Sequence, residues 1–454
     1  MPQKGIPAAF FRGGTSRGLI LRPEHIAPFA PATRERIITS ALGSPDPAGR
    51  QISGLGGGVS SLSKVAIVGV PGEGRDAQEV FGKLPGVPWA DDGHRGGESW
   101  DVVYRFGQVP VKNADPIDWC ASLSSASCGN MVAAAALTAV GTPIIPYSTL
   151  FMRSRTLPAP SDGSPLLFPL SILSASNGVL MHARVPIDPV TLLPWEPEEG
   201  EGVEIAGVPG RDEPGIEIEM PLEFGNASAK GGLVTGRAKD IVKLDDGSEV
   251  TVSILTSGLP NLFLPISSLL SLTSVSLPAD LLTLPSSTLD AHPTLPALLE
   301  RIRVACAERY NLPLSLASPK ITLVGPVPER YETSSGTSVA KGDADLLVRA
   351  ISSGDFHATV PGTTLGAVNI GMGTPGSVIH ELVYGPEGEE KKVNVEVVTV
   401  RAAHAAGVAS SSVKFVAGEP QSVVMVRTAR EIMRGEVMIP RRVFASEGVH
   451  EQFE

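Results

Sequence analysis

Cysteine and aromatic residues are scarce in this sequence. Three of its 454 residues are cysteine, Cys120, Cys128 and Cys306, and they include no Cys-x-x-Cys pair. Such a set offers no even disulfide framework and is typical of a reducing compartment. Aromatic residues make up 5% of the chain, too few for the stacking surfaces that bind single-stranded nucleic acids.

Positive charge and long apolar runs are scarce as well. The chain has 37 Lys and Arg against 48 Asp and Glu, a net charge of −11, which argues against a general binder of nucleic acids or anionic membranes. This balance still permits a local cluster of donors for a small anion. No apolar run approaches transmembrane length, and the first residues lack the apolar core of a signal peptide. We therefore expect a cytoplasmic protein without a nucleic-acid or membrane partner.

Metal and nucleotide motifs are missing too. The eight histidines are scattered, with no HExxH pattern and no Cys/His spacing typical of zinc. The sequence has no GxSxG elbow and no Walker loop. The GLGGG stretch at 54–58 precedes a predicted strand, where a dinucleotide site needs a helix. We therefore expect no metal and no cofactor.

Glycine and proline, by contrast, are abundant. The chain contains 49 glycines and 40 prolines beside 42% apolar residues, which predicts many short elements joined by turns in two or three domains. The stretch FFRGGTSRGLIL (residues 10–21) predicts a hairpin with strands at 6–11 and 18–22. Its Gly-rich turn is also a candidate cradle for an anion, and both interpretations stay open.

Two small-residue apolar segments resemble each other. Residues 130–140 predict a helix that is buried on every side. The segment AAAALTAVGTP (133–143) aligns without gaps with LGAVNIGMGTP (365–375). This similarity favours two similar halves, each built around one buried helix. The alternative is a chance similarity between two Ala/Gly-rich helices. In that register Cys128 falls opposite Val360, so the second half has no matching thiol.

Three residues are candidates for chemistry. Cys128 precedes the first buried helix, where unpaired N–H groups and the helix dipole favour a thiolate or a bound carboxylate; the alternative is a small residue packed into the core. Lys64 precedes a β-branched strand at 65–70 and is either functional or a solvated edge residue. His357 precedes the second helix and is either catalytic or structural.

Five motifs are spread over nearly the whole chain. They are FFRGGTSRG (10–18), GLGGGVSSLSKVAIV (54–68), SCGNM (127–131), SSGDFHATVPGTT (352–364) and RTAREIMRGEVMIP (427–440). Together they resemble the PrpF family, also called the methylaconitate isomerase family. The resemblance implies a diaminopimelate-epimerase-like α/β fold, with two pseudo-symmetric domains that each curl a sheet around a central helix. It implies domains at 1–245 and 246–427 and a C-terminal segment, 428–454, that returns to the first domain.

The resemblance also implies an activity and a set of site residues. Family members isomerise unsaturated polycarboxylates without a cofactor. Lys64 is our first choice for proton transfer, and Ser16 or Cys128 is the second proton carrier. The residues expected to bind substrate are Thr15, Arg17, Gly129, Asn130, Ser353, His357, Thr363 and Thr364.

The chain departs from the family pattern in two places. Arg17 stands where the family usually has lysine, which keeps the charge but removes a base, and AHAAG (403–407) replaces a His-Pro-Ser-Gly segment. Long Pro/Ser insertions and an acidic loop (196–215) resemble fungal aconitate Δ-isomerases of itaconate producers, which favours conversion of cis-aconitate to trans-aconitate. The alternatives are isomerisation or tautomerisation of 2-methylaconitate, methylitaconate or oxalomesaconate, and non-catalytic carboxylate binding. The expected partner is a small tricarboxylate, and a homodimer is left open.

Overall fold

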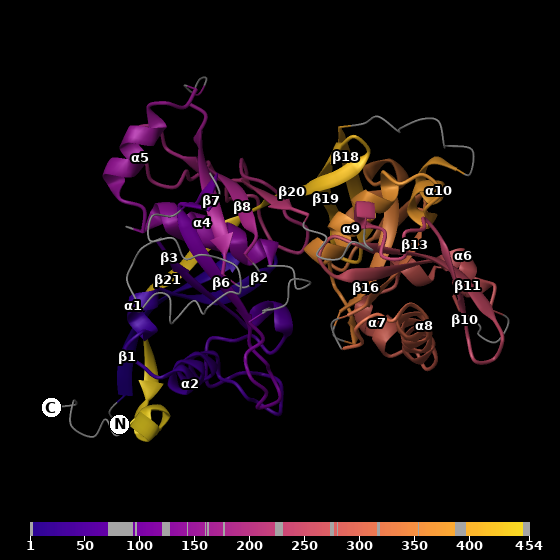
Figure 1. Ribbon diagram of the computed structural model, residues 1–454, viewed down its shortest axis with the longest axis horizontal. Coiled ribbons are helices and arrows are strands. Elements are labelled where there is room, and N and C mark those ends of the chain that lie inside the picture. The colour runs from indigo at the N-terminus through magenta and orange to yellow at the C-terminus, as the bar shows by residue number, and fades with distance from the viewer. Residues whose placement is uncertain are drawn as a thin grey trace. The chain divides into compact units, whose positions relative to one another are not determined.

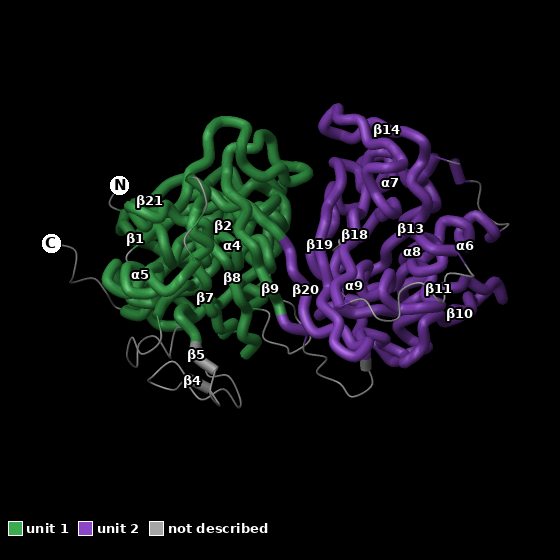
Figure 2. Tube along the Cα trace, turned by 90° about the horizontal axis from the view of Figure 1, so that it is seen from above, with its two compact units in different colours: residues 1–220, 426–454 green, residues 221–425 purple. Residues whose placement is uncertain are grey.

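The chain folds into two compact units, which are coloured separately in Figure 2. Unit 1 contains residues 1–220 and 426–454, and unit 2 contains residues 221–425. The sequence analysis places the divisions after residues 245 and 427. The first division lies earlier in the structure, because β10 (Asp240–Lys243) pairs with β11 and so belongs to unit 2. The computed structural model describes residues 3–70, 94–95, 98–119, 128–142, 144–158, 160, 163–175, 178–222, 230–272, 277–278, 280–315, 318–352, 354–385 and 396–447.

Unit 1 contains a mixed sheet with the strand order β21–β1–β2–β3–β6–β7–β8–β9. The β2/β3 and β6/β7 pairs are parallel, and the other neighbours are antiparallel. The predicted hairpin is confirmed as β1 and β2, and β21, from the end of the chain, lies beside β1 (Figure 1). The bounds are β1 (Gln3–Gly13), β2 (Ser16–Leu21), β3 (Lys64–Gly69), β6 (Val102–Gln108), β7 (Leu166–Ser174), β8 (Leu180–Ile187), β9 (Ile216–Pro221) and β21 (Ala429–Pro440), with a separate pair of β4 (His94–Arg95) and β5 (Glu98–Ser99).

Helix α4 (Gly129–Gly141) is the centre of unit 1 and confirms the predicted buried helix. Its side chains from Met131 to Ala136 are at most 1% exposed, and the helix contacts β1, β2, β3, β6, β8 and β21. Because four successive alanines carry only a methyl group, strands approach the helix closely on several sides. A second core packs strands against α1 (Pro23–Ile26), α2 (Pro31–Leu42) and the 3₁₀ turn Arg441–Glu447, and α5 (Tyr147–Ser154) follows α4.

Unit 2 contains a second mixed sheet, with the order β10–β11–β12–β13–β16–β18–β19–β20 and with β17 also paired to β16. Its buried helix α9 (Gly362–Met372) contacts β11, β18 and β19. The remaining strands are β11 (Glu249–Thr256), β12 (Pro260–Pro265), β13 (Lys320–Gly325), β14 (Arg330–Glu332), β15 (Ser338–Ala340), β16 (Leu346–Ser352), β17 (Asp355–Phe356), β18 (Val397–His404), β19 (Gly407–Val416) and β20 (Glu419–Arg427). The remaining α-helices are α6 (Ile266–Leu270), α7 (Ser286–Asp290), α8 (Leu295–Tyr310) and α10 (Val378–Tyr384). In the described part of the chain, no helix combines the length and the apolar character needed to cross a membrane.

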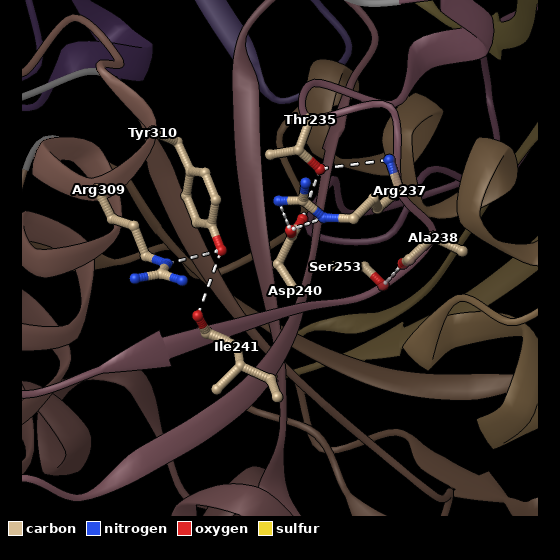
Figure 3. A network of polar contacts seen from close by, with 8 residues as sticks. All are labelled: Thr235, Arg237, Ala238, Asp240, Ile241, Ser253, Arg309 and Tyr310. Carbon is tan, nitrogen blue, oxygen red and sulfur yellow. Dashed lines mark hydrogen bonds and ion pairs between the residues drawn. The ribbon is translucent and has the colours of Figure 1, made fainter.

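An ion pair between the buried Asp240 and the exposed Arg237 anchors strand β10 (Figure 3). The Asp240 carboxylate accepts hydrogen bonds from the Thr235 hydroxyl (2.6 Å) and from Nε of Arg237 (2.7 Å). The Tyr310 hydroxyl, at the end of α8, donates to the carbonyl of Ile241 at 3.2 Å. The charge of Asp240 is thus neutralised inside unit 2, and the cluster ties β10 to α8.

The two units repeat one strand plan. In each, an antiparallel hairpin is followed by a parallel partner, an antiparallel strand, the buried helix, another parallel partner and two further antiparallel strands. Lys64 opens β3 opposite Gly18, and Lys320 opens β13 opposite Asn261. This confirms the predicted diaminopimelate-epimerase-like α/β fold.

The starts and ends of the two buried helices bracket the expected register. The residue that precedes α4 is Cys128 and the residue that precedes α9 is Pro361, whereas α4 ends at Gly141 and α9 ends at Met372. The helix starts therefore differ by 233 residues and the helix ends by 231, on either side of the offset of 232 between the two similar segments. Neither Val360 nor Pro361 carries a thiol.

We expect Ala134→Leu to lower the free energy of unfolding by about 1–3 kcal/mol, because the larger side chain overpacks a fully buried position. The space around Ala134 is small, since a Cβ atom added to Gly13 would lie 3.2 Å from the Cβ atom of Ala134. The matched control is Ala32→Leu on the exposed side of α2. Urea unfolding monitored by circular dichroism gives both values, and equal effects at the two positions would contradict the central role of α4.

Candidate functional site

The turn between β1 and β2 lies directly on the first turn of α4. Gly14 has φ +49°, and its N–H donates to the carbonyl of Thr428 at 2.7 Å. A Cβ atom on Gly13 would lie 2.0 Å from the carbonyl oxygen of Asn130, and one on Gly14 would lie 2.2 Å from Oδ1 of Asn130. The contact at Gly13 is with the main chain of α4 and excludes any side chain, whereas a side chain at Gly14 would displace the Asn130 amide and would be strained by the positive φ.

Asn130 connects this turn to the helix. Its Nδ2 donates to Oγ1 of Thr15 and to Oγ of Ser16, both at 3.2 Å. Gly129 and Asn130 are the first two residues of α4, where N–H groups have no acceptor inside the helix. Cys128 precedes them, is half-buried and does not cap the helix with its side chain. The structure therefore brings five predicted residues of unit 1 to one place.

Arg427 belongs to the same cluster and was not among the residues predicted from sequence. Its Nε donates to Oδ1 of Asn130 at 3.1 Å, and its Nη1 donates to the carbonyl of Val426 at 2.7 Å. Burial lowers the pKa of Arg427 to about 10, an effect that negative charge on Cys128 opposes. The guanidinium thus remains a cation at neutral pH. The motif that contains Arg427 also contains the exposed Arg430, and nothing in the sequence distinguishes the two.

A second arginine at the turn is neutralised locally. Nη2 of Arg12 lies 2.8 Å from Oε1 of Glu213, and Nη1 of Arg12 donates to Oγ1 of Thr428 at 2.8 Å. Glu213 comes from the acidic loop noted in the sequence. This pair therefore ties the acidic loop to the end of β1 and leaves the charge of Arg12 compensated.

Lys64 is buried at the start of β3, with 9% of its surface exposed. Its Nζ donates to Oε1 of Gln108 at 2.6 Å and lies 5.2 Å from the ring centroid of Phe106. Nε2 of Gln108 donates to the carbonyls of Ser60 (3.0 Å) and Ser63 (2.9 Å). Because these carbonyls fix the amide, Oε1 must face the ammonium group. Gln108, which the sequence analysis did not select, thus positions Lys64.

The Gly-rich loop at 54–58 is organised by Gln51 and lies near Arg17. Gln51 is fully buried, its Nε2 donates to Oγ of Ser63 at 2.7 Å, and its Oε1 accepts from the N–H of Gly58 at 2.9 Å. A Cβ atom on Gly57 would lie 2.8 Å from Nη2 of Arg17. The glycine thus makes room for the Arg17 guanidinium.

The other predicted binding residues lie in unit 2. Oγ1 of Thr363 accepts a hydrogen bond from Nζ of Lys320 at 3.1 Å, and the fully buried Thr364 donates to Oδ1 of Asn261 at 2.9 Å. Nδ1 of His357 accepts from the N–H of Thr359 at 3.0 Å. Ser353 lies outside the described residues. The roles assigned to all four residues stay predictions.

Across the described ranges, no three His, Cys, Asp or Glu side chains gather closely enough to hold a metal ion. Unit 1 instead offers hydroxyl and N–H donors beside the cation Arg427 and, at the start of β3, the buried cation Lys64 with Gln108 as its partner. Such a set can bind carboxylates and move protons.

Curated relatives match the chain over nearly their whole length. The 2-methyl-aconitate isomerase of Shewanella oneidensis is 28% identical over 97% of this chain and 98% of its own. The 3-methylitaconate isomerase of Eubacterium barkeri is 25% identical over 97% and 98%. The crystal structure of methylitaconate-delta-isomerase has a TM-score of 0.67 at 24% identity, covering 100% of this chain and 99% of that one, and so shares the fold.

These relatives are named as isomerases, and the protein is an isomerase. The family also follows from the sequence comparison. The model described as PrpF protein matches residues 3–84 and 96–440, and the chain belongs to that family.

We expect Gly14→Ala to destabilise unit 1 beyond the cost of its backbone conformation, because the new methyl group collides with Asn130. The control is Gly200→Ala, where φ is +79° and nothing lies within 4 Å of the added Cβ. Both changes place alanine at positive φ, so the difference between them, about 1–3 kcal/mol, isolates the collision. Urea titrations of the two variants measure it, and equal losses would show that the turn does not need the close approach.

Proposed function

We propose that the protein isomerises unsaturated tricarboxylates by a 1,3-proton shift, with cis-aconitate to trans-aconitate as the reaction. The observation that carries the proposal is the turn of unit 1, where the buried Arg427 and the hydroxyl groups of Thr15 and Ser16 meet at Asn130 in a chain of net charge −11. A local excess of buried positive charge and N–H or O–H donors favours a small polyanion. The names of the family relatives, which refer to unsaturated carboxylic acids, support the same class of substrate.

The reaction needs one base and one acid. The methylene proton of cis-aconitate lies alpha to a carboxylate and allylic to the double bond. Removal of this proton breaks a C–H bond and gives a dienolate. Protonation of the former vinylic carbon then forms a new C–H bond and moves the double bond, without any change in oxidation state. No cofactor is required by this balance.

The residues of unit 1 suit these roles. Lys64 is held by Gln108 at 2.6 Å and carries out proton transfer in the proposal. Ser16 or Cys128 carries the second proton. Thr15, Asn130 and the start of α4 hold a carboxylate through hydroxyl and N–H donors. Arg17, with its guanidinium beside the Gly-rich loop, is a further carboxylate partner.

The relatives suggest alternative substrates. Their names specify 2-methyl-aconitate, 3-methylitaconate and, for the protein of Novosphingobium sp. strain KA1, (4E)-oxalomesaconate. All share a double bond conjugated to a carboxylate, so the same proton shift applies to each.

The test is incubation of the purified protein in D₂O with a panel of these acids and cis-aconitate, followed by ¹H NMR. We expect isomerisation of cis-aconitate with deuterium in the methylene group of the product, because the transferred proton exchanges with solvent. No turnover of any member of the panel would contradict the proposed reaction and favour a carboxylate-binding protein. Faster turnover of another acid would reassign the substrate.

We expect Lys64→Met to lower kcat by about 10²- to 10⁴-fold, the range for a positioned acid or base. The matched control is Lys112→Met, which removes the same charge from an exposed position of unit 1. Steady-state kinetics and circular dichroism of both variants provide the measurement. A folded Lys64→Met variant with near-normal kcat would remove Lys64 from the chemistry.

A further inference from the structure

Buried arginines elsewhere in the protein are surrounded by acceptors. Arg349, 1% exposed, donates to the carbonyls of Leu282 (3.1 Å) and Leu284 and to Oγ of Ser286 (2.9 Å). Arg303, 8% exposed, bonds to Glu300 and to three main-chain carbonyls. These arrangements satisfy most of the five N–H donors of a guanidinium group.

Arg427 differs from both. It is 9% exposed, yet among the described residues it makes only two hydrogen bonds, to Asn130 and to its neighbour Val426. No carboxylate in the described ranges pairs with it, whereas Arg12, at the same turn, has Glu213. A buried cation without a counter-ion is costly, and a bound anion removes that cost.

The position of Arg427 is that of an anion site. It lies against the first turn of α4, a helix of 13 residues, where the N-terminal N–H groups favour negative charge. The added Cβ of Gly14 would lie 3.2 Å from Cδ of Arg427, so the arginine also borders the hairpin turn. The helix end and the uncompensated cation are independent observations that indicate the same kind of ligand.

Arg427 also determines the direction of the neighbouring hydrogen bonds. An arginine only donates, so the oxygen of the Asn130 side chain faces Nε of Arg427 and the amide nitrogen faces Thr15 and Ser16. Both hydroxyl oxygens therefore accept from Asn130. Neither hydroxyl proton has an acceptor among the described residues, so both are available to a ligand.

We propose that Arg427 is the counter-ion for one carboxylate of the substrate and that, through Asn130, it directs the hydroxyl groups of Thr15 and Ser16 toward that carboxylate. This inference rests on the proposed function and adds a binding residue to it. The group is a carboxylate partner and a positioning residue rather than a proton carrier, since a guanidinium does not release its proton at neutral pH.

The test measures binding separately from catalysis. Isothermal titration calorimetry with propane-1,2,3-tricarboxylate, which has no double bond to move, gives Kd for the wild-type protein and for Arg427→Gln. We expect Arg427→Gln to weaken binding by roughly 10- to 100-fold, the range for a charge-assisted hydrogen bond. Its KM for the unsaturated substrate should rise by a similar factor, while kcat changes less.

Two further variants complete the design. Arg430→Gln removes the same charge from an exposed position three residues away and should leave Kd within about twofold, as expected for a screened surface charge. Arg427→Lys keeps the charge but loses the planar donor set and should bind between the wild-type and Gln variants. If Arg427→Gln does not fold, Arg427→Lys decides, since an unchanged Kd in that variant overturns the inference.

The outcomes separate this inference from the proposed function. A wild-type protein that isomerises and binds tricarboxylates, with Arg427→Gln equal to it, overturns the role of Arg427 alone. Equal weakening in Arg430→Gln overturns it too, because net charge then explains the effect. A wild-type protein that neither binds nor isomerises any tricarboxylate overturns both.

Discussion

The site in unit 1 depends on one steric constraint, the contact between the Gly13–Gly14 turn and the first turn of α4. Main-chain and side-chain oxygens of Asn130 occupy the space where Cβ atoms would stand. This contact brings Asn130 within reach of Thr15 and Ser16 and leaves one side of its amide to Arg427. Larger residues in the turn would separate the hairpin from the helix and with it the donors from one another.

The two units repeat the same order of strands, but the side chains at equivalent positions have different partners. Lys64 and Lys320 open equivalent strands, yet Lys64 donates to Gln108 while Lys320 donates to Thr363 in the first turn of α9. Cys128 precedes α4, whereas neither Val360 nor Pro361, which precede α9, carries a thiol. The thiol at the start of the buried helix is therefore a feature of unit 1 that unit 2 does not repeat.

Local patterns predict a large part of this fold. The β1–β2 hairpin follows from glycines between apolar runs, and α4 follows from an apolar Ala-rich segment. Gln51, Gln108 and Arg427 could not be selected in this way, because their roles arise from partners far away in the chain. The division after residue 220 could not be located from local patterns for a similar reason, since it depends on the pairing of β10 with β11, which is a tertiary contact.

The pairing of β1 with β21 has a consequence for biogenesis. Unit 2 is a continuous segment, residues 221–425, whereas unit 1 needs both the beginning and the end of the chain. During synthesis from the N-terminus, the segment of unit 2 leaves the ribosome before the strand that closes unit 1. The edge of β1 stays unpaired during that interval, and Arg427 reaches the hairpin only after the segment of unit 2 has been synthesised. A chain truncated before β21 would thus have an open sheet edge.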